Sequence, residues 1–140
     1  MDDIKYHFLI VDDSKLDCFV AEKVIKNSGK AVTIKSFLEP LKALDYIKGY
    51  SDFDSLKTIL ILDIQMPVMT GHQFIEAFEK LSQEIQKRYI IYMISSSSNE
   101  SDINRIANYK SVRKFSNKSI NKEMIDGFLK DIKLCQQAAL

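Results

Sequence analysis

Short runs rich in apolar and β-branched residues alternate along this chain with stretches in which apolar residues recur every three or four positions. The runs predict strands at residues 6–11, 31–37, 58–62, 88–94 and 111–115. The stretches that follow each run predict five helices. This alternation indicates βαβ units around a parallel sheet. Because parallel strands need right-handed crossovers, the sequence predicts a doubly wound α/β sandwich.

Residues typical of helix ends mark the predicted helices. Ser14 is a candidate N-cap for the first helix, and Gly29 suits its end. Pro40 is tolerated in the first turn of the second helix, and Asn99 can cap the fourth. The third helix is predicted from the spacing of Phe74, Ile75, Phe78 and Leu81, and the last from that of Met124, Ile125, Phe128, Leu129 and Ile132.

Four of the predicted strands lead into residues that can bind phosphate or a metal. Asp12 and Asp13 follow the first strand, Asp63 the third and Ser95 the fourth, while Lys118 comes shortly after the fifth. Ligands of open α/β sheets bind at the carboxyl edge of the strands. We therefore expect three carboxylates, a hydroxyl and an ammonium group to meet at that edge.

Taken singly, these residues have ordinary explanations: a solvated turn or helix cap for the acids, a loop hydroxyl for Ser95 and a solvent-exposed side chain for Lys118. Three neighbouring carboxylates repel one another, and a hard cation such as Mg²⁺ relieves the repulsion. Mg²⁺, Ser95 and Lys118 together would stabilise a phosphoryl group. A carboxylate can itself be the nucleophile, and Asp63, on the central strand, is the candidate.

Length and composition predict one soluble domain over residues 1–140, with a core at about 6–134. The net charge of +1 predicts no nucleic-acid or membrane partner. No apolar stretch approaches the roughly 20 residues of a membrane-spanning helix, and the polar N-terminus is unlike a secretory signal. Cys18 and Cys135 form no CxxC pair, which favours reduced thiols and a cytoplasmic location. His7 and His72 stand alone, so neither suggests a metal site.

Two segments resemble the receiver domain of two-component response regulators. They are residues 9–14, Leu-Ile-Val-Asp-Asp-Ser, and residues 62–71, Leu-Asp-Ile-Gln-Met-Pro-Val-Met-Thr-Gly. The resemblance extends from about residue 6 to about residue 134. It implies a flavodoxin-like sheet of strand order 2-1-3-4-5 with five helices.

The resemblance also implies a role for each matching residue. Asp63 corresponds to the phosphoacceptor, and Mg²⁺ would be bound by Asp12, Asp13, Asp63 and the backbone carbonyl of Gln65. Ser95 corresponds to the switch hydroxyl, Lys118 to the phosphate-binding lysine and Phe115 to the switch aromatic residue.

Two positions depart from the family pattern. Ser119 follows Lys118 where the family usually has proline, often after a cis bond, and a cis bond before a non-proline residue is costly. The loop that presents Lys118 is therefore expected to be looser or differently aimed. Ser95 stands where threonine is commoner, and this exchange keeps the hydroxyl.

By the same resemblance, the chain is a phosphoacceptor signalling domain and not an enzyme. A sensor histidine kinase or a histidine phosphotransfer protein would donate the phosphoryl group, docking on the first helix near Leu16, Asp17 and Val20, unless the two apolar residues belong to the core. Phosphorylation would switch contacts with a downstream protein that the sequence does not identify, in a monomer or weak dimer. No DNA-binding output domain is predicted. Candidate readout residues, or simply solvated charges, are Tyr109, Lys110, Arg113 and Lys114, and Met66 and Met69 are either adaptable contacts or packing residues.

Two alternatives belong to other classes. One is a receiver-like interaction module that is never phosphorylated, for which the missing proline at Ser119 is the argument. The other is a Mg²⁺-dependent phosphatase of the haloacid dehalogenase type, which also forms an aspartyl phosphate. That family has a second acid two residues after its nucleophile, where this chain has Gln65.

Overall fold

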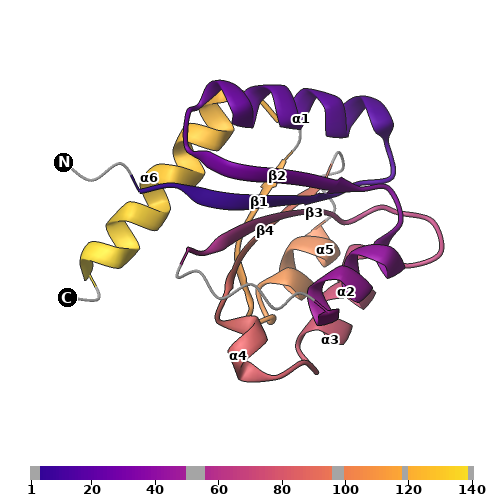
Figure 1. Cartoon of the computed structure of the whole chain (residues 1–140). Helices are drawn as coiled ribbons and strands as arrows, with labels where there is room; N and C mark the ends of the chain where they lie inside the picture. Colours follow the sequence, from indigo (N-terminus) through magenta and orange to yellow (C-terminus); the bar gives the residue numbers. More distant parts are fainter. Residues whose placement is uncertain (1–3, 50–55, 96–99, 118–119, 139–140) are drawn as a thin grey trace.

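The computed structural model of the chain describes residues 4–49, 56–95, 100–117 and 120–138. The elements in chain order are β1 (Tyr6–Val11), α1 (Lys15–Asn27), β2 (Ala31–Phe37), α2 (Pro40–Gly49), β3 (Thr58–Asp63), α3 (Gly71–Phe78), α4 (Gln83–Gln86), β4 (Tyr89–Ser95), α5 (Glu100–Ile106), β5 (Val112–Asn117) and α6 (Lys122–Ala138). The strands form one parallel sheet in the order β2-β1-β3-β4-β5 (Figure 1). The predicted doubly wound α/β class and strand order are confirmed.

The helices differ from the prediction in two details. The described part of the chain holds six helices and not five, because the short helix α4 was not predicted. The third predicted helix, α3, ends at Phe78, so Leu81 lies beyond it in the turn before α4, where it still packs against the core. The predicted cap Asn99 lies outside the described residues.

The helices begin where side chains can accept hydrogen bonds from free backbone N–H groups. The Ser14 hydroxyl accepts from the N–H of Asp17 at 3.2 Å, which confirms Ser14 as the N-cap of α1. Thr70 and Gln73 form a reciprocal capping box at the start of α3. The start of α3 is thereby fixed shortly after the end of β3.

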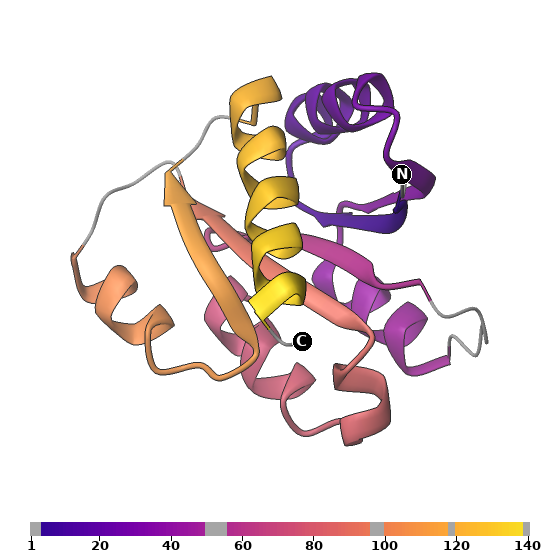
Figure 2. The ribbon, with the colours of Figure 1, turned by 90° about the vertical axis from the view of Figure 1, so that its left-hand side faces the viewer.

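The sheet separates two apolar clusters, and alternate residues of each central strand face opposite sides. Leu9 and Leu60 belong to the cluster beneath α2, α3 and α5, whereas Phe8 and Ile61 belong to the one beneath α1 and α6. Figures 1 and 2 show the two helical layers on either side of the sheet. The strands β1, β3 and β4 are therefore covered on both faces, as expected of the centre of a parallel sheet.

The strand register brings the carboxyl ends of the strands to nearly the same level. Val11 pairs with Leu62, and Asp63 pairs with Ile94. Beyond these pairs, the N–H of Asp12 donates to the carbonyl of Phe37 at 3.1 Å. The carboxyl ends of β1, β3 and β4 therefore lie side by side at one edge of the sheet.

None of the helices in the described ranges is both long and apolar enough to cross a membrane.

Candidate functional site

Three aspartates meet at the carboxyl edge of the sheet. One carboxylate oxygen from each of Asp12, Asp13 and Asp63 lies within 4.8 Å of the others. Asp12 and Asp63 are buried, whereas Asp13 is exposed. The predicted convergence of these three side chains therefore occurs, and they form an acid cluster with Asp13 on its solvent-facing side.

Backbone contacts hold Asp12 in position. Its Oδ1 accepts a hydrogen bond from the N–H of Ser14 at 3.0 Å, and its own carbonyl accepts from the thiol of Cys18 at 3.4 Å. Burial, helped by the nearby negative charge of Asp12, raises the pKa of the Cys18 thiol to about 11. Cys18 is therefore a protonated donor at neutral pH, and α1 is tied to the end of β1 through it.

The loop after β3 folds back closely on Asp63. Gly71 donates its N–H to the carbonyl of Ile64 at 2.8 Å, and a Cβ atom at position 71 would lie only 2.7 Å from the carbonyl oxygen of Asp63. The Asp63 Oδ1 also accepts from the N–H of Gln65 at 3.4 Å. Val68, at the tip of the loop, has a φ of 71° and is 88% exposed. Such a φ is unusual for a β-branched residue, so the turn is held in a costly conformation.

The three aspartates suit a hard divalent cation. Mg²⁺ prefers oxygen ligands and commonly takes one or two protein carboxylates, keeping its other positions for water or phosphate. A cation also offsets the repulsion among three acids so close together, two of which are largely removed from water. The donor set therefore fits the predicted Mg²⁺, with Asp13 on the open side.

Ser95 is fully buried at the end of β4, one residue beyond the partner of Asp63 in the register. Phe115 lies on β5 opposite Met93, half-buried against the cluster beneath α2, α3 and α5. The structure thus places Ser95 next to the aspartates in the sheet. Lys118 and Ser119 lie outside the described residues.

The candidate contact residues fall into different environments. Leu16 and Val20 are 69% and 38% exposed on α1, so neither belongs to the core. Arg113 and Lys114 both pair with Asp131 of α6, at 2.8 and 3.3 Å, while Lys110 is exposed. Met66 is buried and Met69 half-buried, and both pack on the apolar cluster beneath α2, α3 and α5, which favours a packing role.

A group of polar side chains between α3 and the segment after α5 was not predicted from the sequence. The buried His72 lies beside Tyr109, whose hydroxyl oxygen is 3.5 Å from the ring Nδ1. The same hydroxyl donates to Glu76 at 3.1 Å. His72 and Glu76 are four residues apart on α3, a spacing that places side chains on one helix face and was the available signal.

The fold and the three aspartates agree with comparisons to known proteins. A family model of the response regulator receiver domain matches residues 8–130. The chain belongs to this family. Receiver domains are signalling domains of two-component systems: they bind Mg²⁺ at an acidic pocket and interact with histidine kinases or phosphotransfer proteins.

Two curated relatives of this receiver domain come from Arabidopsis thaliana. The two-component response regulator ARR3 is 34% identical over 103 residues, which cover 71% of this chain and 43% of that protein. The two-component response regulator ARR15 is 37% identical over 97 residues, which cover 66% of this chain and 46% of that protein. The chain thus matches less than half the length of these relatives.

Solved structures include similar receiver domains. A response regulator receiver protein from Dyadobacter fermentans is 28% identical, with a TM-score of 0.80 over 90% of this chain and 96% of that one. The chemotaxis protein CheY4 of Vibrio cholerae is 20% identical, with a TM-score of 0.73 over 91% of this chain and 98% of that one. The second comparison bears on the fold alone.

Proposed function

We propose that this receiver domain accepts a phosphoryl group on Asp63 in a reaction that needs Mg²⁺. The observation that carries the proposal is the meeting of three carboxylates within 4.8 Å at the sheet edge of a receiver-family chain. Asp63 ends the central strand β3, between Asp12, which directly follows the neighbouring strand β1, and Ser95, which ends the other neighbour, β4. It is therefore the acid that the other groups surround.

The transfer is a nucleophilic displacement at phosphorus. A carboxylate oxygen of Asp63 forms the new P–O bond, and the P–N bond to the imidazole of a phosphohistidine donor breaks. Asp12, Asp13, Asp63 and the backbone carbonyl of Gln65 would hold Mg²⁺, which supplies positive charge against the phosphoryl oxygens. Ser95 donates a hydrogen bond to one of these oxygens, and Lys118 neutralises another.

The phosphodonor is a sensor histidine kinase or a histidine phosphotransfer protein that docks on the first turns of α1. The exposure of Leu16 and Val20, close to the cap residue Ser14 and the acids before it, supports this surface. A half-buried Asp17 lies between them. An exposed apolar strip beside the acid cluster suits a partner that must bring a phosphohistidine to Asp63.

The response to phosphorylation begins with Ser95 and Phe115. A hydroxyl drawn to the new phosphoryl oxygens would bias the segment after β4 and the position of Phe115 on β5, shifting a two-state equilibrium. The altered surface would then change the affinity for a downstream protein. A single receiver domain over residues 1–140, a cytoplasmic location and a monomeric or weakly dimeric state stay predictions.

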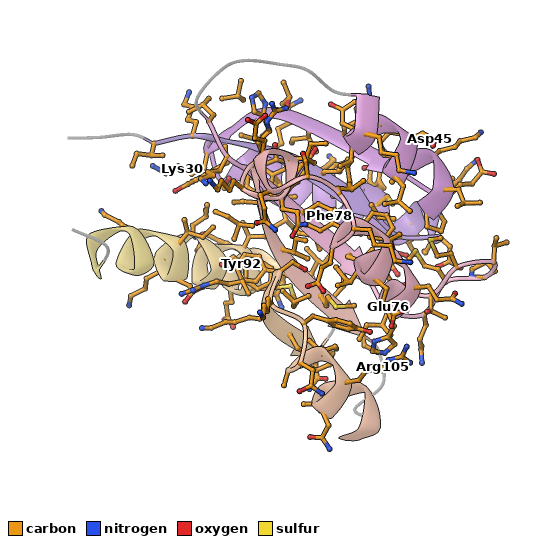
Figure 3. All side chains as sticks on the ribbon, turned by 90° about the horizontal axis from the view of Figure 1, so that it is seen from below. Lys30, Asp45, Glu76, Phe78, Tyr92 and Arg105 are labelled. Carbon is orange, nitrogen blue, oxygen red and sulfur yellow. The ribbon has the colours of Figure 1, made fainter. Side chains whose placement is uncertain are left out.

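Intact mass after incubation with Mg²⁺ and acetyl phosphate tests the proposal. The wild type should gain one phosphoryl group, whereas Asp63→Asn, or the wild type with EDTA, should not. Asp45→Asn, which removes an exposed acid from α2, is the matched control and should react like the wild type (Figure 3).

Two other outcomes would redirect the assignment. No adduct on the wild type, with Mg²⁺ binding established, would refute the proposal in favour of an interaction module that is not phosphorylated. Turnover of a generic phosphomonoester that depends on Asp63 would favour the phosphatase.

A further inference from the structure

Few of the described side chains of α5 hold it to the rest of the domain: Ile106 is buried, while Ile103, Asn104 and Arg105 are exposed. The helix begins at Glu100, shortly after Ser95 in the sequence. The described contacts near its other end therefore bear on how readily the helix moves.

Those contacts converge on one carboxylate of α3. Glu76 Oε2 accepts a hydrogen bond from Arg105 Nη2 at 3.1 Å and another from the Tyr109 hydroxyl at 3.1 Å. Figure 3 shows Glu76 and Arg105 beside each other. The bond from Arg105 has the larger effect and that from Tyr109 the smaller, and together they hold the pKa of Glu76 below its usual range. The carboxylate is therefore charged at neutral pH.

Tyr109 gives the contact a rigid backing. Its ring lies 6.0 Å from that of His72, centroid to centroid, and His72 is buried at the start of α3. Just beyond, both the N–H and the hydroxyl of Ser111 donate to Glu79, the C-cap residue of α3, at 2.9 and 2.7 Å. Hydrogen bonds to α3 and its C-cap residue thus hold the chain from Arg105 to Ser111 in position. Of these bonds, the one from Arg105 to Glu76 involves a residue of α5 itself.

We propose that Glu76, Arg105 and Tyr109 form a latch that favours the present position of α5 and so sets how strongly the domain responds to modification of Asp63. The inference rests on the proposed function and adds a positioning residue, Glu76, outside the acid cluster. In the sequence, α3 begins shortly after Asp63 and α5 shortly after Ser95. The latch joins these two helices, so a motion that draws Ser95 toward a phosphoryl group must work against it.

The size of the effect follows from the exposure of the pair. The side chains of Arg105 and Glu76 are 53% and 50% exposed, so water screens their attraction. A phosphoryl group or its mimic shifts the equilibrium between the two positions of α5 only by the difference in its affinity for them. Opening the latch should therefore change the equilibrium by about two- to fivefold.

The first arm of the test measures α5 in the unmodified protein. Glu76→Gln should speed amide hydrogen exchange over residues 103–110 by about two- to fivefold. Arg105→Gln should have a similar effect, and the double variant should add little to either single one, because both remove the same contact. Glu84→Gln, which removes an exposed acid from α4, is the control and should leave this exchange unchanged.

The second arm measures the affinity of the same variants for beryllofluoride with Mg²⁺, a phosphoryl mimic. Glu76→Gln should bind it about two- to fivefold more tightly than the wild type, and Tyr109→Phe should shift affinity in the same direction. Unchanged exchange in Glu76→Gln would refute the latch. Faster exchange with unchanged affinity would refute its role in the response. Wild-type protein that binds no beryllofluoride would refute the proposed function, and with it that role, while the exchange arm still reports on the contact.

Discussion

Gly71 lies where the chain returns to Asp63, and its replacement by alanine tests whether this close approach holds the site together. A Cβ atom there would lie 2.7 Å from the Asp63 carbonyl oxygen and 2.8 Å from the Ile64 Cα, both backbone atoms, and 3.0 Å from Met93 Cε. Met93 can yield, but the two backbone contacts require the loop or the end of β3 to shift. Overpacking of this kind costs about 1–3 kcal/mol.

Gly127 offers the same substitution with the opposite expected sign. It lies within α6, and a Cβ atom there would meet nothing within 4 Å. Gly127→Ala should therefore raise the free energy of unfolding by about 0.5–1 kcal/mol, through helix propensity alone. Gly71→Ala should lower it by about 1–3 kcal/mol.

Urea unfolding of both variants, with the slope m compared to check that each unfolds in a similar way, measures the difference. Phosphorylation by acetyl phosphate should also slow in Gly71→Ala alone, because Asp63 is attached to the displaced backbone. Equal stability of Gly71→Ala and the wild type would show that the loop adapts without cost, and the argument for a rigid approach to Asp63 would be wrong.

Two further predictions concern stability. Hydrogen bonds from Arg113, and less strongly from Tyr92 and Lys114, lower the pKa of Asp131 to about 2 from an ordinary value of 3.8. The charged Asp131 carboxylate therefore stabilises the folded state above about pH 4, and this stabilisation is lost as the pH falls through about 2. The full difference corresponds to roughly 2 kcal/mol. Because Arg113 and Lys114 are 37% and 58% exposed, we expect Asp131→Asn to lower the free energy of unfolding at pH 7 by about 1 kcal/mol and to flatten its dependence on pH between 4 and 2 in acid unfolding. Val68→Asn should relieve about 1 kcal/mol of backbone strain and so raise the melting temperature. A melting temperature no higher than that of the wild type would show that Val68 is unstrained.

The elements with clear periodicity could be predicted from the sequence. The bounds of β1 and β2 are those expected from the runs at 6–11 and 31–37, and β3 extends one residue beyond the predicted run, to Asp63. These runs are recognised by their apolar and β-branched composition, which is a local property of the chain. The helix α4 has four residues and no buried side chain, so no apolar repeat in the sequence could predict it. The capping residue Ser82 was its one local signal.

The acid cluster could be predicted because a parallel sheet aligns the ends of its strands. Asp12, Asp13 and Asp63 needed only the order of the strands to be brought together. The environments of other candidates depend on contacts between distant residues. Arg113 is paired with Asp131, across 18 positions of sequence, and Tyr109 with Glu76, across 33. No spacing rule within one element reveals such partners.

The division of the core by the sheet has a consequence for how this domain can diverge. The buried residues beneath α1 and α6 and those beneath α2, α3 and α5 form separate clusters. Substitutions far apart and without shared partners usually have independent effects on stability. Substitutions on the α1 side, around the exposed Leu16 and Val20, could thus adapt the domain to a new partner without changing the contacts between α3 and α5. Specificity for the partner and the strength of the response to phosphorylation would then evolve as separate traits within one small domain.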